Sequence, residues 1–214
     1  EFDPGERVWE IGPGLGCYTD ALLAGGASVT AIEVDRGFAD WLRERYAREP
    51  RFDLVEGDAL QEMTRCDGVA HLVGNLPYHI STPLIMSAMA LGRPPGRMVF
   101  MLQWEMARRL CAAPRSEDYG AVSVAVRSAY RVEMLRRIPP TVFHPRPEVD
   151  SAAVRLTLRS DRPVLGAGFG AFVRAGFAAP RKQLLNVVAS NAEARTRWVD
   201  ALRNAGLRSD VRAG

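Results

Sequence analysis

Several residue types are scarce in this 214-residue sequence, and each shortage excludes a class of protein. Its three cysteines form no CxxC pair and its three histidines are scattered, so we predict neither a disulfide framework nor a bound metal. No apolar run approaches the length of a membrane span. Residues 1–4 show no signal-peptide pattern. We therefore expect a cytoplasmic protein with no membrane partner.

Lysine is nearly absent, because Lys182 is the only lysine among 28 Lys and Arg residues. The charges are also uneven: residues 1–75 hold 15 acidic and 7 basic side chains, whereas residues 76–214 hold 10 acidic and 21 basic ones. The planar guanidinium of arginine suits phosphates and stacking on bases. A basic half beside an acidic half predicts a polyanion on one face, although a solvated Arg-rich surface would give the same counts.

A glycine-rich turn follows the first expected strand, residues 8–12. Gly12, Gly14 and Gly16 occupy every second position and Glu10 precedes them. Glycines at this spacing allow a tight turn and a close approach of a ligand to the backbone, although packing alone could require them. The pattern differs from the dinucleotide fingerprint and resembles S-adenosylmethionine-dependent methyltransferases. Because that methyl donor is cationic, an acidic Glu10 near its sulfonium or amino group is electrostatically reasonable.

Acidic residues follow the next two expected strands. Glu33 ends the strand at 28–32 and lies 17 residues after Gly16, close to where a dinucleotide-type fold has its ribose-binding acid. Asp58 follows the strand at 52–56, and it is a candidate acceptor for an adenine amino group or a helix N-cap, or both. Ligands of open α/β sheets bind at the carboxyl ends of strands, so we predict one cofactor pocket here.

A fourth expected strand, about residues 68–74, leads into Asn75-Leu76-Pro77-Tyr78. This loop offers a hydrogen-bonding amide, a fixed backbone turn and a flat aromatic face, which a planar, weakly nucleophilic amine needs if it is to be held and methylated. The side-chain oxygen of Asn75 and the carbonyl of Leu76 are the candidate acceptors for the amine, and Pro77 fixes the turn. Tyr78 is predicted to stack on the target base.

A stiff, proline-rich loop over residues 139–151 separates two further expected strands, 130–138 and 154–158, the latter antiparallel to its neighbour. The loop carries Phe143, which we interpret as a second stacking platform; a ring that packs as a hydrophobic plug is the alternative. From residue 161 onward the composition changes to short basic helices. We predict a methyltransferase domain at 1–160 and a small helical domain at 161–214 that binds RNA, or is only a basic cap.

Together these motifs resemble the ribosomal RNA adenine dimethyltransferase family, most closely its small-subunit branch. The resemblance covers about residues 4–212 and rests on the segments 10–16, 33–35, 57–60, 75–78, 80–83, 119–120, 142–151 and 181–186. It implies an α/β fold of the Rossmann-like class I S-adenosylmethionine-dependent methyltransferase type. Such a fold has a mostly parallel seven-stranded sheet with one antiparallel strand, here followed by a small C-terminal α-helical domain.

The sequence departs from the family in four places. An N-terminal segment that closes over the methionine end of the cofactor is absent, and the C-terminal domain of the family runs further, so we expect truncation at both ends. Trp104 stands where the family often has lysine, and Ala179-Pro180 stands where the family tends to be more basic.

The resemblance implies N6,N6-dimethylation of adenosines in 16S ribosomal RNA by a monomer that acts on immature small ribosomal subunits, with S-adenosyl-L-methionine as cofactor. The expected catalytic residues are Asn75, Leu76, Pro77, Tyr78 and Phe143; the expected cofactor-binding residues are Glu10, Gly12, Gly14, Gly16, Glu33, Asp58, Ala59 and Asn75; the expected RNA-binding residues are Arg146, Arg174, Arg181 and Lys182.

Four alternatives stay open at this point: a large-subunit rRNA dimethyltransferase of the antibiotic-resistance type, a DNA adenine methylase, a ribosome-assembly factor that binds RNA without catalysis and, more remotely, an NAD-dependent oxidoreductase. The proline-rich loop and the basic helical segment favour structured RNA over DNA. The intact glycine, acidic and Asn75 set argues against a protein that only binds RNA. The glycine spacing disfavours an NAD enzyme.

Overall fold

The computed structural model describes residues 3, 5–77, 79–144, 146–164, 166 and 168–212. The chain forms two compact units: unit 1 comprises Glu1–Ala107 and Ala129–Asp161, and unit 2 comprises Arg108–Ser128 and Arg162–Gly214. Residues 108–128, which we expected in the first domain, thus belong to unit 2. Spatial contacts group this segment with the C-terminal part of the chain, a relation that continuity along the sequence does not reveal.

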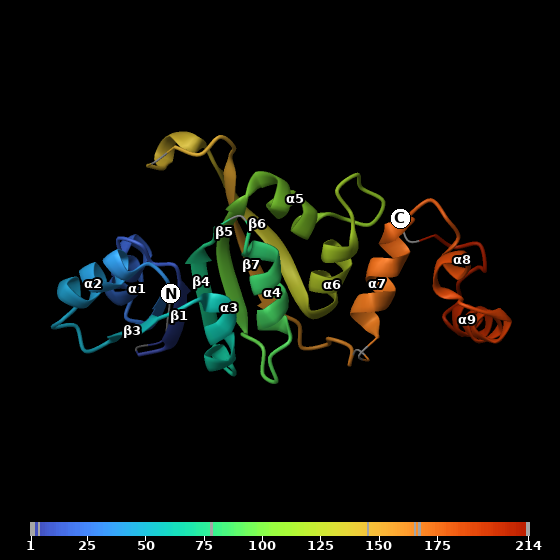
Figure 1. The fold of residues 1–214 in the computed structure, drawn as a ribbon, viewed down its shortest axis with the longest axis horizontal. Helices are drawn as coiled ribbons and strands as arrows, with labels where there is room; N and C mark the ends of the chain where they lie inside the picture. Colours follow the sequence, from blue (N-terminus) through green and yellow to red (C-terminus); the bar gives the residue numbers. More distant parts are fainter. Residues whose placement is uncertain are drawn as a thin grey trace. The chain divides into compact units, whose positions relative to one another are not determined.

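Seven strands of unit 1 form one sheet in the order β3-β2-β1-β4-β5-β7-β6 (Figure 1). The strands are β1 (Arg7–Ile11), β2 (Ser28–Glu33), β3 (Phe52–Glu56), β4 (His71–Asn75), β5 (Arg97–Gln103), β6 (Tyr130–Ile138) and β7 (Ser151–Leu158). Neighbouring strands among β1 to β5 pair in parallel, and β7 runs antiparallel to both β5 and β6. The predicted mixed sheet is confirmed.

Helices and short 3₁₀ turns connect the strands. They are α1 (Cys17–Ala24), α2 (Arg36–Arg45), α3 (Ala59–Glu62), η1 (Met63–Cys66), α4 (Ser81–Met89), α5 (Trp104–Cys111), α6 (Ala121–Ala129) and η2 (Pro140–Val142). After the last strand come α7 (Phe169–Ala178), α8 (Leu184–Val188) and α9 (Ala192–Asn204), which belong to unit 2 together with most of α6. Within the described residues, no helix is both long and apolar enough to span a membrane.

Helices α2 and α4 differ in how they begin. The side chain of Asp35 caps α2, which ends at Arg45. Ile80 is the N-cap of α4 and makes no side-chain cap bond. The Ser81 hydroxyl instead donates to the carbonyl oxygen of Pro77 at 3.1 Å. This bond ties the first turn of α4 to the loop that follows β4.

Hydrophobic residues are buried on both faces of the sheet. On one face, Leu72, Phe100 and Val154 from three neighbouring strands are fully buried. On the other face, the half-buried Val73 packs against a buried cluster that includes Val8 of β1. Gly74 permits a close approach of β1 and β4, since a Cβ there would come within 2.6 Å of the Ile11 carbonyl oxygen. Glycine is therefore required where β4 runs toward its carboxyl end.

Candidate active site

The carboxyl ends of β1, β2 and β4 lie side by side. Ile11 pairs with Ile32 on one side and with Gly74 on the other, so the turn that begins at Gly12 lies between the ends of the two neighbouring strands. The Gly12 N–H donates to the carbonyl of Ile32 at 2.9 Å. Asn75 directly follows Gly74 and is exposed. The glycine turn and Asn75 are thus brought to one edge of the sheet, as the sequence predicts.

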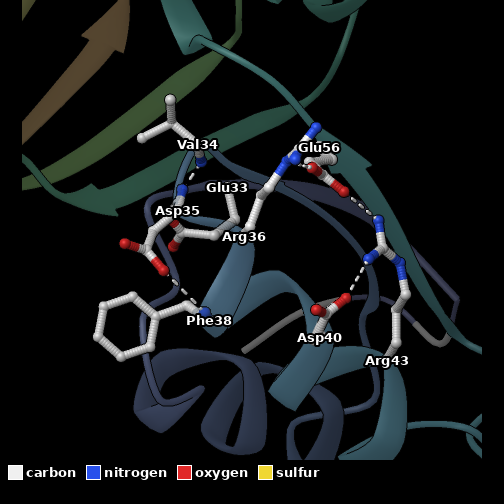
Figure 2. Close-up of polar contacts among 8 residues, drawn as sticks. All are labelled: Glu33, Val34, Asp35, Arg36, Phe38, Asp40, Arg43 and Glu56. Atoms are coloured by element: carbon white, nitrogen blue, oxygen red, sulfur yellow. Dashed lines mark hydrogen bonds and ion pairs between the residues drawn. The ribbon is translucent and has the colours of Figure 1, made fainter.

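Glu33 organises this edge through its carboxylate. The side chain is 5% exposed, and one oxygen accepts from the backbone N–H groups of Val34 and Asp35, both at 2.9 Å. The other oxygen accepts from the Gly14 N–H at 3.1 Å. Asp35 in turn caps α2 by accepting from the Phe38 N–H at 3.0 Å (Figure 2). The end of β2 is therefore fixed to the glycine turn and to α2 at once.

The three glycines of the turn have positive φ angles but different surroundings. Gly12 (φ 63°) and Gly14 (φ 56°) would place a Cβ where no atom lies within 4 Å, so glycine keeps that space open. At Gly16 (φ 86°) a Cβ would collide with the hydroxyl of Tyr46, which lies 3.1 Å from the Gly16 carbonyl oxygen. Gly12 and Gly14 therefore face free space, whereas Gly16 serves the packing of α1 against α2.

Glu10 is buried in the middle of the sheet, with 1% of its surface exposed. Its carboxylate accepts a hydrogen bond from the buried hydroxyl of Thr19 at 2.6 Å. Burial raises the pKa of Glu10 to about 7, and the hydrogen bond from Thr19 opposes this shift. Near neutral pH the group therefore titrates within the folded protein, which the sequence pattern did not indicate.

A cavity of about 290 Å³ lies at the ends of β1, β2 and β3, and we call it the strand-end cavity. Gly12, Glu33, Asp58 and Ala59 line it, and all four were predicted to bind the cofactor. Asp58 also caps α3, because its side chain accepts from the Leu60 N–H at 2.9 Å. The capping alternative for Asp58 is thus confirmed, and it does not remove the residue from the cavity wall.

A second cavity of about 570 Å³ lies beside the loop after β4, and we call it the loop cavity. Its wall includes Asn75, Leu76 and Phe143, three of the predicted catalytic residues. Phe143 is half-buried, so it is neither a fully exposed platform nor a fully packed plug. Pro77 and His79 line both cavities, so the two cavities share a wall.

The remaining predicted residues have other surroundings. Tyr78 lies outside the described residues. Arg146 is exposed in unit 1, and Arg174, Arg181 and Lys182 are exposed in unit 2, where their contact with RNA stays a prediction.

Sequence reasoning missed two histidines of the loop cavity. His79 and His144 both contribute to its wall, and each directly follows a predicted stacking residue in the chain. Examining the neighbours of Tyr78 and Phe143 would have found them.

Known proteins resemble this chain over most of its length. The family model described as ribosomal RNA adenine dimethylase matches residues 1–207. A ribosomal RNA small subunit methyltransferase A from Synechococcus sp. (strain JA-3-3Ab) is 42% identical over 195 residues, which cover 88% of this chain and 70% of the relative. The protein of the same name from Moorella thermoacetica is 38% identical and covers 97% of this chain and 77% of the relative.

Solved structures are similar across the whole chain. A dimethyladenosine transferase from Plasmodium falciparum superposes with a TM-score of 0.86 at 23% identity, covering 99% of this chain and 86% of the other. The 23S rRNA methyltransferase ErmE gives a TM-score of 0.74 at 27% identity, covering 100% of this chain and 86% of the other. With the matched family model and these relatives, the chain belongs to the ribosomal RNA adenine dimethylase family.

Proposed function

We propose that this protein transfers methyl groups from S-adenosyl-L-methionine to the N6 atoms of adenosines in small-subunit ribosomal RNA, two to each adenosine. The observation that supports this most is the wall that the strand-end cavity and the loop cavity share at Pro77 and His79. A methyl donor in one cavity and an acceptor in the other would meet at this wall.

The strand-end cavity fits the adenosine end of the cofactor. Carboxylates at Glu33 and Asp58 are acceptors suited to ribose hydroxyls and an adenine amino group, and the open space at Gly12 lets a ligand approach the backbone. When bound, S-adenosylmethionine supplies an electrophilic methyl group on a sulfonium. The protein must only hold it so that the methyl faces the shared wall.

The loop cavity fits a target adenine that has been turned out of its strand. The lone pair of its amine is delocalised into the ring, and acceptors on both N–H groups localise it. The side-chain oxygen of Asn75 and the Leu76 carbonyl fill that role in our proposal. Ser81 and Ile80 both donate to the Pro77 carbonyl, at 3.1 and 3.2 Å, which fixes the turn that presents these acceptors.

Alignment accounts for most of the rate in this proposal. Phe143 and Tyr78 stack on the base, each contributing on the order of 1–3 kcal/mol, and the acceptors aim the nitrogen at the methyl. The amine loses its proton after the new N–C bond has formed, so no strong base is required. Two transfers to one adenosine also require the loop cavity to accept an amine that already carries one methyl.

The partner in this proposal is the immature small ribosomal subunit. Exposed basic residues, Arg146 in unit 1 and Arg174, Arg181 and Lys182 in unit 2, are the candidates for phosphate contacts. We further propose that the protein acts as a monomer in the cytoplasm.

The direct test is methyl transfer from labelled S-adenosylmethionine to undermethylated small-subunit particles, followed by nucleoside analysis. We expect N6,N6-dimethyladenosine in small-subunit RNA and none in protein-free large-subunit RNA offered in parallel. Methylation of the large-subunit RNA alone would favour the antibiotic-resistance type of activity. RNA binding without any methyl transfer would favour an assembly factor, and cofactor calorimetry would then show whether the donor binds.

A further inference from the structure

Three side chains from separate strand ends meet at the base of the loop that carries Phe143. Arg137 is the second-last residue of β6, Asp150 immediately precedes β7, and Trp104 immediately follows β5. The guanidinium of Arg137 lies 4.4 Å from the centre of the Trp104 ring. Its Nε donates to the Asp150 carboxylate at 2.6 Å, and its Nη2 pairs with the same oxygen. We call these residues the loop clamp.

A backbone bond completes the cluster. The Trp104 N–H donates to the Asp150 carbonyl oxygen at 2.9 Å. Asp150 is thus held twice, through its side chain by Arg137 and through its backbone by Trp104. The segment between Arg137 and Asp150 contains Phe143, so the clamp joins both ends of this segment to each other and to the end of β5.

A β-bulge determines which arginine joins the clamp. The register between β6 and β7 shifts between Met134 and Arg136, after which Arg137 pairs with Ala152. Without the bulge, the register of residues 130–134 would continue and Arg136 would stand opposite Ala152. The bulge therefore places Arg137 opposite Ala152. From that position the Arg137 side chain contacts both Trp104 and Asp150.

The ring at position 104 suits a cationic neighbour. A lysine there would bring a second positive charge to Arg137, whereas the face of an indole attracts a guanidinium. The carboxylate of Asp150 neutralises the charge of the same guanidinium. The cation of Arg137, the anion of Asp150 and the π face of Trp104 therefore attract one another in this arrangement.

We propose that the loop clamp is a positioning device that holds Phe143 at the wall of the loop cavity, an inference that rests on the function proposed above. Phe143, Pro147 and Ser151 all line that cavity, and Ser151 directly follows Asp150. Joining the two ends of the loop reduces the conformations it must lose when the base binds. Trp104, Arg137 and Asp150 act through Phe143 and touch no reacting atom.

The test is a double-mutant cycle between Trp104→Leu and Phe143→Ala, with methyl transfer to undermethylated small-subunit particles as the readout. W104L should lower kcat/KM for the particles about two- to fivefold, the range expected for an exposed cation–π pair. In the F143A background the same change should have no further effect, because the group through which it acts is gone. Calorimetry should give the same cofactor Kd for W104L and the wild type.

Two further variants serve as controls. Trp41→Leu removes another half-exposed indole that lies under an arginine, with Arg45 at 5.9 Å from its ring, but on α2. Its kcat/KM should equal that of the wild type. Trp104→Phe keeps an aromatic face and should recover most of the loss. If W104L does not fold, Arg137→Gln replaces it in the cycle with the same expectations.

The outcomes are distinct. An unchanged kcat/KM in W104L, or a loss that is equally large in the F143A background, overturns the positioning role while leaving the proposed function intact. A wild type that transfers no methyl group to any RNA overturns the proposed function, and the inference with it.

Discussion

The two cavities that meet at Pro77 and His79 are built in different ways. The strand-end cavity is formed by residues at the ends of parallel strands, and its central carboxylate, Glu33, is held by three backbone N–H groups. The loop cavity depends on a long connection between β6 and β7, which in Figure 1 (yellow) extends past the end of the sheet. One cavity is thus fixed by the sheet, and the other by a loop that needs its own supports.

This difference indicates where each kind of mutation should act. Changes in the strand-end cavity should alter cofactor affinity and the stability of unit 1, because the groups that we propose to bind the cofactor also join strands. Changes in the loop cavity should alter methyl transfer while leaving the fold and cofactor affinity nearly unchanged.

Asn75→Ala should produce the largest effect. Removing one preorganised group that acts on the reacting atoms typically lowers a rate by about 10²–10³-fold. Because Asn75 is exposed on the wall of the loop cavity, we expect the cofactor Kd to stay close to that of the wild type. Methyl incorporation and calorimetry measure the two quantities separately. An active N75A variant would refute the proposed role, and a large loss of cofactor affinity would break the division between the cavities.

Glu10→Gln should change how stability depends on pH. Burial raises the pKa of Glu10 from 4.5 to about 7, so its contribution to stability is fully present below pH 4.5 and is lost as the pH rises through 7. The loss amounts to roughly 3 kcal/mol at most. Urea denaturation of E10Q at pH 4.5 and pH 8 should show a smaller decrease than that of the wild type. Equal decreases in both proteins would contradict the raised pKa.

Glu33→Gln should weaken cofactor binding by about 10- to 100-fold, because hydrogen bonds to a charged acceptor contribute about 1.5–3 kcal/mol. The matched control is Glu56→Gln, which changes the neighbouring residue on β3 whose carboxylate pairs with Arg43 at the surface (Figure 2). Calorimetry should show an unchanged Kd for E56Q. Equal cofactor affinities of E33Q and E56Q would mean that the Glu33 carboxylate only accepts backbone hydrogen bonds and does not bind the cofactor.

Phe143→Ala should lower kcat/KM for the RNA particles by about tenfold, within the range of one lost base-stacking partner. Because the Phe143 ring is only half-buried, its removal should lower kcat/KM less than removal of a fully enclosed ring would. Phe143→Trp keeps a stacking face and is the control, with activity near that of the wild type. An F143A variant that loses stability and cofactor affinity together would instead support the packed-plug interpretation.

The strand-end cavity was largely predictable from the sequence. Gly12, Glu33 and Asp58 each lie at or just after the end of a strand, and parallel strands bring such positions to one edge, so local patterns were sufficient. The contacts that each residue makes with other elements could not be predicted from these patterns. The hydrogen bond between Glu10 and Thr19 joins a strand to the following helix, and the close contact of Gly16 with Tyr46 spans 30 positions in the chain.

The loop cavity was predictable only in part, because it depends on packing between segments that are distant in the sequence. Asn75 and Phe143 lie 68 positions apart in the chain, and only the resemblance to a family brought them together before the structure did. The loop clamp was not foreseen: Trp104 stood out as a departure from the family, but the bulge in β6 that brings Arg137 to it is not visible in the sequence. The grouping of residues 108–128 with unit 2 was also missed, because it too depends on packing between segments that are distant in the sequence.

The wall at Pro77 and His79 has a thermodynamic consequence. A ligand that shifts this wall from one side changes the affinity on the other, and reciprocity requires the same factor in both directions. Spent donor and methylated RNA would then leave as linked events, and a dissociation constant measured for either one alone would describe a different state from the ternary complex.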